Sequence, residues 1–93
     1  MDKFIMVTSL PKPQYVDGRA TGEVYHITSF VNVENIVSIM PTTTSVDIPQ
    51  ANLNYKHEGS KVNLIDGSTL TCEQSALRLV HEIERMQDSQ STK

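Results

Sequence analysis

The sequence contains no tryptophan and a single cysteine, and only 5% of its residues are aromatic. One cysteine, Cys72, cannot form an internal disulfide, which is typical of proteins in a reducing cytoplasm. The apolar run near the N-terminus, residues 4–7, is too short for a signal peptide or a membrane span. These absences predict a cytoplasmic protein that does not contact the membrane.

Basic charge is also scarce and scattered. The chain of 93 residues has a net charge of −3, and its eight lysine and arginine residues form no run. A protein that binds a nucleic-acid duplex normally carries a basic stripe, because phosphate contacts supply most of the affinity. Nucleic-acid binding is therefore the weakest functional alternative.

The residues that usually carry catalysis do not converge in the sequence. The four glycines are too far apart to form a phosphate-binding loop. His26, His57 and His81 fall on different predicted elements, and none lies at zinc-ligand spacing from a cysteine or carboxylate. The segment that begins at His81 has Arg85 where a zinc-protease helix needs a second histidine. We therefore expect no catalytic residue, no metal site and no cofactor, and hence no enzyme.

Cys72 and Asp66 are open to two interpretations. A thiol close to a helix N-terminus can be activated as a nucleophile, but it can also serve as a small apolar core residue. The second interpretation is favoured for Cys72, and turn formation rather than catalysis is favoured for Asp66.

Three segments rich in β-branched or aromatic residues predict strands: residues 3–10, 24–31 and 36–40. A turn or single helical turn is expected at residues 32–35. Pro41 is expected to end the third strand or to place it at a sheet edge. Residues 11–23 and 42–60 are predicted as long loops, with a tight turn at Asp17-Gly18 and a short strand near residues 43–47.

Asp66-Gly67 lies between two short strand-like segments and predicts a β-hairpin. A two-residue loop would mix apolar and polar residues on each face. A three-residue loop instead pairs Leu64 with Ser68 and Val62 with Leu70, which gives one apolar face. We therefore predict a type I turn followed by Gly67 in the left-handed region.

Residues 73–86 repeat apolar side chains at helical spacing and predict a helix. The helix could start with a capping box of Thr71 and Gln74, or with Gln74 and Ser75 in its first turn. Residues 1–87 are predicted to form one domain, and residues 88–93 a disordered tail.

The predicted fold class is α+β: a twisted antiparallel sheet of four to five strands, formed by a meander and the Asp-Gly hairpin, with the C-terminal helix on one face. Edge strands and a small core favour a homo-oligomer, most simply a dimer. The expected contacts place four helix residues against six strand residues. These are Ala76, Leu79, Val80 and Ile83 against Phe4, Met6, Ile27, Val62, Leu64 and Leu70.

In a meander, the two long loops emerge at the same end of the sheet. Long ordered loops in a compact domain are often functional. The candidate binding residues are Lys12, Tyr15, Arg19, Asn54, Tyr55, Lys56 and His57. Their cations and tyrosines predict a surface for an anionic or protein ligand, the alternative being that both loops are mobile and bind nothing.

The segments "FIMVT", "VNVENIVSI", "VNLIDGSTL" and "EQSALRLVHEI" together resemble short bacterial and phage proteins of the FlbD-like flagellar family. The resemblance covers about half the chain and departs from the family pattern at Gln74, where a serine is usual. It implies the α+β fold, and a small accessory protein of a phage or mobile element fits this chain at least as well as a flagellar protein.

The leading functional prediction is a non-enzymatic binding or regulatory protein that acts through protein–protein contacts. The alternative is a binder of an anionic metabolite or nucleotide, held between residues 11–23 and 42–60 or at a subunit interface.

Overall fold

The computed structural model describes the backbone of residues 3–91 and the side chains of residues 3–86. Seven strands and one C-terminal helix are found in this part of the chain, and all strand pairs are antiparallel. The strands are β1 (Phe4–Thr8), β2 (Lys12–Val16), β3 (Arg19–Tyr25), β4 (Thr28–Asn32), β5 (Ile36–Ile48), β6 (Leu53–Leu64) and β7 (Thr69–Cys72). The helix is α1 (Ala76–Ser91), and two 3-10 turns are η1 (Val33–Asn35) and η2 (Pro49–Ala51). The predicted α+β class is confirmed, with more strands than expected.

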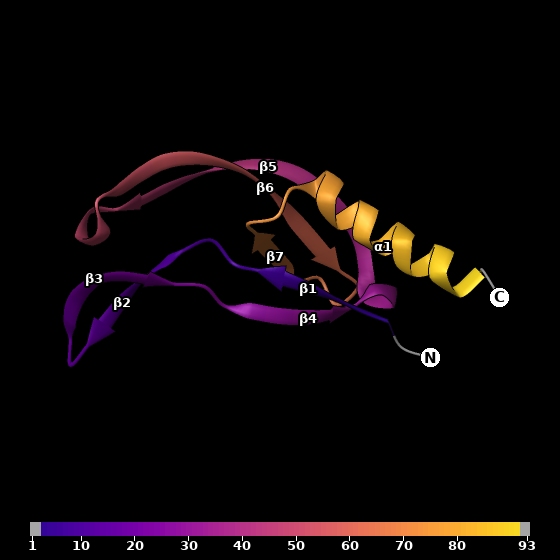
Figure 1. Ribbon diagram of the computed structural model, residues 1–93, viewed down its shortest axis with the longest axis horizontal. Helices are drawn as coiled ribbons and strands as arrows, with labels where there is room; N and C mark the ends of the chain where they lie inside the picture. Colours follow the sequence, from indigo (N-terminus) through magenta and orange to yellow (C-terminus); the bar gives the residue numbers. More distant parts are fainter. Residues whose placement is uncertain (1–2, 92–93) are drawn as a thin grey trace.

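The strands form three sheets: β1–β4, β2–β3 and β5–β6–β7. The first and third sheets are joined where Ser9 bridges Cys72 and the amide of Glu73 donates to the carbonyl of Thr8 at 2.7 Å. Together with α1 they form the body of the molecule (Figure 1). The helix contacts β5, β1 and β6.

Two long hairpins extend from this body as arms (Figure 1). We call β2–β3 the short arm, and residues 43–57 of β5 and β6 with η2 the long arm. The molecule measures 52 × 26 × 26 Å.

The prediction that residues 11–23 and 42–60 are long loops is wrong, because both segments fold as hairpins. The short strand predicted near residues 43–47 is present as part of β5. In the short arm, Asp17 and Gly18 have φ values of 52° and 80°, so this pair forms the predicted tight turn. In the long arm, β5 continues through Pro41 to Ile48, well beyond the predicted end at Met40. Pro41 is tolerated because β5 is an edge strand of its sheet. The predicted strand at residues 24–31 is in turn split at His26 and Ile27.

The Asp66-Gly67 hairpin has the predicted register. Val62 pairs with Leu70, and the amide of Leu64 donates to the carbonyl of Ser68 at 2.9 Å. The amide of Gly67 donates to the carbonyl of Leu64 at 3.0 Å, and the φ of Gly67 is 91°. The turn followed by a left-handed glycine is therefore confirmed.

The core lies between the two joined sheets and α1. Its buried residues are Ile5, Val7, Val31, Val62, Cys72 and Leu79. Ile36, Ile39, Leu64, Leu70, Ile83 and Met86 are among the partly buried residues that pack against them. The predicted positions Val62, Leu64, Leu70, Leu79 and Ile83 are thus correct.

The predicted core positions on β1 are wrong. Phe4 and Met6 are about half exposed, whereas Ile5 and Val7 are buried. The strand register explains the difference: Ile5 pairs with the buried Val31, so the alternation turns Phe4 and Met6 to the other face. Ile27 and Val80, also predicted in the core, are 47% and 36% exposed.

Helix α1 begins after Ser75, whose hydroxyl accepts a hydrogen bond from the amide of Arg78 at 3.2 Å and caps the first turn. Gln74 instead binds the edge of β1: its Oε1 accepts from the amide of Thr8, and its Nε2 donates to the carbonyl of Met6, both at 2.9 Å. The backbone of residues 87–91 continues the helix, and residues 92–93 of the predicted tail lie outside the described part.

Candidate functional site

The predicted binding residues lie on the two arms. Lys12 and Tyr15 are on β2, Arg19 is on β3, and residues 54–57 are on β6. The arms meet near their tips, where the Nε2 of Gln50 in η2 donates to the hydroxyl of Tyr15 at 2.8 Å. The backbone of Gly22 approaches the carbonyl of Gln50 there, and a side chain at Gly22 would contact that oxygen. The structure therefore brings the two segments together, as hairpins rather than loops.

Strand alternation divides the β6 residues of this predicted cluster. Tyr55 and His57 are paired with Val46 and Thr44, on the face that carries the buried Val46. Asn54 and Lys56 are paired with Asp47 and Ser45, on the opposite face. The four residues thus point to two different sides of the long arm and cannot form one site with each other.

The imidazole rings of His57 and His26 each lie within hydrogen-bonding distance of a main-chain carbonyl oxygen. The Nε2 of His57 lies 2.6 Å from the carbonyl oxygen of Glu73, and the rings of Tyr55 and His57 are nearly perpendicular, with centroids 6.3 Å apart. The Nδ1 of His26 lies 2.9 Å from the carbonyl oxygen of Ser9 and 3.9 Å from the Glu73 carboxylate. His57 therefore attaches the base of the long arm to the segment that links β7 to α1, and His26 attaches the base of the short arm to Ser9.

The charge of the two segments does not favour an anionic ligand. Residues 11–23 and 42–60 carry three cations, Lys12, Arg19 and Lys56, against four carboxylates. On its face of the long arm, Lys56 has Asp47 as a diagonal neighbour on β5 and Glu58 two residues further along β6. Such a mixed surface has no strong positive potential.

The sequence motif around Asp66 and Cys72 has a structural role. The Asp66 carboxylate accepts hydrogen bonds from the hydroxyl and the amide of Ser68, and these bonds lower the pKa of Asp66. Cys72 is 1% exposed, and burial raises the pKa of its thiol. A thiol that is buried and protonated is a poor nucleophile. Among the side chains that the structure describes, no group of three or more histidine, cysteine or carboxylate residues could hold a metal ion.

An exposed apolar face on β1 and β4 is the feature that sequence reasoning missed. Met6 pairs with Phe30, and Phe4 lies two residues before Met6 on the same face. Their exposed fractions are 48% for Phe4, 49% for Met6 and 69% for Phe30. We call these three residues the Phe face. Both phenylalanines of the chain lie on it, although phenylalanine is among the residues most often buried in domains.

The sequence did contain a signal for this face. Residues 4–7 are apolar without alternation, so that strand had to expose either Phe4 and Met6 or Ile5 and Val7. The strand register decides between the two, and the register depends on contacts far apart in the sequence.

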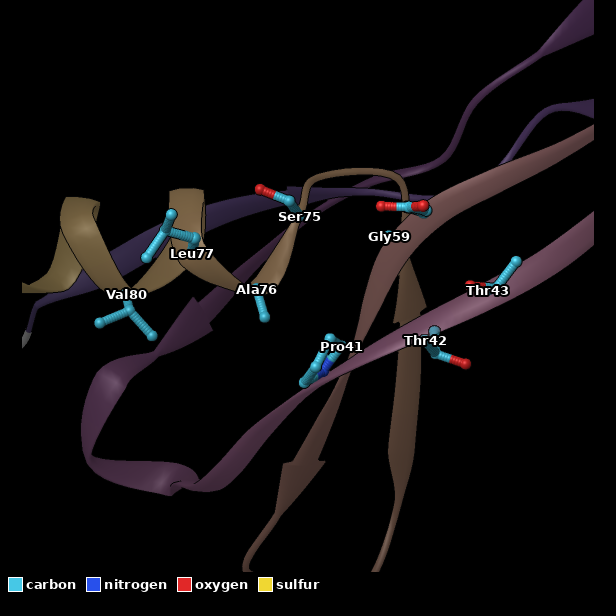
Figure 2. Close-up of a pocket in the computed structure, with 9 residues that line it drawn as sticks. Pro41, Thr42, Thr43, Gly59, Ser75, Ala76, Leu77 and Val80 are labelled. Atoms are coloured by element: carbon cyan, nitrogen blue, oxygen red, sulfur yellow. The ribbon is translucent and has the colours of Figure 1, made fainter.

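A second apolar surface is a groove of about 550 Å³ between the start of α1 and the base of the long arm (Figure 2). Ala76, Leu77 and Val80 line it from the helix, and Pro41 from β5. Figure 2 shows these side chains around an open space beside the strands. Gly59 of β6 also lines it, and a side chain at this position would overlap the carbonyl oxygen of Cys72.

No family model, no curated protein and no solved structure matches this chain. The resemblance to FlbD-like proteins therefore stays a prediction. In the part of the chain that the structure describes, no helix is long and apolar enough to cross a membrane.

Proposed function

We propose that this chain is a non-enzymatic protein that acts by binding another protein through the Phe face. The observation that carries the proposal is that both phenylalanines and Met6 are exposed side by side on one sheet face. Aromatic residues and methionine are enriched in protein interfaces, and a few buried residues at the centre of an interface carry most of its binding energy. A domain with a small core loses stabilising apolar burial when it exposes these residues. A partner that covers them restores that burial.

The anionic-ligand alternative has less support. Its four residues on β6 point to two sides of the long arm, and carboxylates outnumber lysine and arginine in the two segments. The arrangement favours a protein partner for this molecule over a metabolite or nucleotide.

The composition offers a direct test, because the only phenylalanines are Phe4 and Phe30. Fluorophenylalanine incorporated into the chain would report on the Phe face alone, and fluorotyrosine would label the arms at Tyr15, Tyr25 and Tyr55. We expect a protein partner to shift the ¹⁹F resonances of both phenylalanines and to leave those of Tyr15 and Tyr55 unchanged. Shifts confined to the tyrosines would contradict the proposal and favour a site on the arms.

Matched variants complete the test. Phe30→Ser with Met6→Ser is expected to abolish partner binding, since an interface centred on this face would lose two of its main contacts. Val37→Ser with Ile65→Ser is the control, because these side chains are as exposed as Phe30, at 65% and 66%. Both variants are expected to keep the circular dichroism spectrum of the wild type. Equal loss of binding in both pairs would contradict a specific role for the Phe face.

A further inference from the structure

Strand β5 forms an unusually long free edge. It spans 13 residues and pairs only with β6 within the described sheets. Its distal part, residues 42–48, leads from beside the start of α1 into the long arm (Figure 1) and carries no lysine, arginine or glutamate. Soluble proteins usually protect such edges with charged side chains, proline or short strands, because unpaired amides and carbonyls attract another strand. In β5, Pro41 and Asp47 are the only residues of these protective kinds.

The position of Pro41 indicates which backbone groups are free. Proline has no amide hydrogen, so in an edge strand its nitrogen faces away from the neighbouring strand. The register is unbroken from Pro41 to Ile48, and backbone direction alternates along a strand. The amides and carbonyls of Thr43, Ser45 and Asp47 therefore point outward. Pairing this edge would not disturb the hydrogen bonds between β5 and β6.

The total surface of the chain also exceeds what a monomer of this size normally exposes. The accessible surface is 6478 Å², whereas a compact monomer of 10.4 kDa exposes about 5,400 Å². The excess of about 1,000 Å² is comparable to the roughly 800 Å² that each partner buries in a stable interface. A second copy of this chain supplies a matching edge without any other component.

We propose that the distal edge of β5 pairs antiparallel with the same edge of a second copy around a two-fold axis at Ser45. In this register Ser45 lies opposite Ser45 of the second copy, and Thr43 lies opposite Asp47 of the second copy. All three outward-facing residues then form hydrogen-bonded pairs, and the two Asp47 carboxylates are kept apart. The two β5–β6–β7 sheets become one continuous sheet, and the Phe face stays free for a different protein.

The test is the mass of the full chain in solution, measured by sedimentation over a concentration series. The wild type is expected to approach twice the 10.4 kDa chain mass. Ser45→Pro removes an outward amide and is expected to give a monomer, whereas Ser45→Ala keeps that amide and is expected to remain a dimer. Circular dichroism of Ser45→Pro checks that the long arm is still folded; Ser45→Lys, which places two cations face to face, is a second disrupting variant that leaves the backbone unchanged.

A cross-link locates the axis. Hydrogen-bonded antiparallel pairs have Cα atoms about 5.5 Å apart, within the range that a disulfide spans. Ser45→Cys is expected to form a covalent dimer on mild oxidation, and Asn54→Cys, exposed on β6 away from the edge, is the control that is expected not to. The buried Cys72 does not compete.

Three outcomes would overturn the proposal. One is a wild type that stays monomeric at every concentration. Another is a dimer that persists in both Ser45→Pro and Ser45→Lys. The third is a dimer that is lost only in Phe30→Ser with Met6→Ser, which would place the contact on the Phe face. Loss of heterologous binding with the dimer intact would instead concern the function proposed above, so the two proposals fail separately.

Discussion

Gly67 and Gly59 show two different reasons for a glycine in this fold. Gly67 has a φ of 91° and open space around the position of a Cβ. Gly59 has no such backbone strain, but a Cβ there would overlap the carbonyl oxygen of Cys72, where the chain crosses β6 on its way to α1. The first glycine is needed for its conformation and the second for its size.

Substitution by alanine is expected to separate these two reasons. Gly67→Ala is expected to lower the free energy of unfolding by about 1 kcal/mol, because a left-handed residue with a side chain is strained. Gly59→Ala is expected to cost about 3 kcal/mol, because backbone must move to admit the methyl group. Urea denaturation followed by circular dichroism measures both values.

Asparagine at position 67 provides the control for this pair. It tolerates the left-handed region better than alanine. Gly67→Asn is therefore expected to be closer to the wild type than Gly67→Ala. A cost for Gly59→Ala no larger than that for Gly67→Ala would contradict the close packing at the crossing point.

The sequence predicted the conformations of single turn residues better than any larger feature of the fold. The turn at Asp66-Gly67 depends on local chemistry, and local chemistry was enough to predict its loop length, its register and the conformation of Gly67. The burial of Cys72 followed from the same face assignment.

Among the elements, the side chain of Gln74 adds two hydrogen bonds to the join between the β1–β4 sheet and the β5–β6–β7 sheet. Its side-chain Oε1 accepts a hydrogen bond from the amide of Thr8, and its Nε2 donates to the carbonyl of Met6. The backbone of a neighbouring strand would bind these groups in the same way. The carbonyl of Gln74 accepts from the hydroxyl of the buried Ser60 at 2.8 Å. One residue thus links β1, β6 and the start of α1.

Gln74→Ala is expected to lower the free energy of unfolding by about 1–3 kcal/mol, because it leaves an amide and a carbonyl of β1 without a partner. Gln74→Glu is expected to cost a similar amount, because a carboxylate can still accept from Thr8 but cannot donate to Met6. Ser75→Ala is the control in the adjacent residue and is expected to cost about 1 kcal/mol through loss of the helix cap. Chemical denaturation measures all three, and a Gln74→Glu variant as stable as the wild type would show that the bond to Met6 contributes nothing.

Element boundaries were predicted less well than turns, and the reason is physical. Residues 42–48 are mostly Thr, Ser and Asp, with Val46 and Ile48 as their two apolar side chains, so only a short strand was predicted within an otherwise loop-like segment. Their strand conformation depends on pairing with residues 53–59, which no local signal specifies. The buried face of β1 was predicted wrongly for the same reason, because it depends on pairing with a distant strand. The Phe face was missed with it.

At the scale of the whole molecule, the fold is far from spherical. The radius of gyration of the Cα atoms is 15.7 Å, whereas a compact domain of this length has about 12 Å. The arms account for the difference, since they extend away from the body that holds the core (Figure 1). Sequence patterns could not predict this shape, because segments that looked like loops form the arms.

Small-angle X-ray scattering checks the shape directly. For the monomeric variant Ser45→Lys we expect a radius of gyration near 15.7 Å, with hydration raising it slightly. A value near 12 Å would show that the arms fold back on the body in solution, and it would remove the free edge from which the second copy is inferred.

The short arm is expected to unfold locally more easily than the body of the molecule. No residue of β2 or β3 is fully buried, and a two-stranded ribbon is marginally stable by itself. Its contact with η2 rests on the bond between Tyr15 and Gln50 and on the approach of Gly22. The amides of β2 and β3 are therefore expected to exchange with solvent through local openings that leave Ile5, Val62 and Leu79 packed. The body unfolds as the cooperative unit of the molecule. The short arm opens at a small fraction of the free energy that unfolding of the body requires.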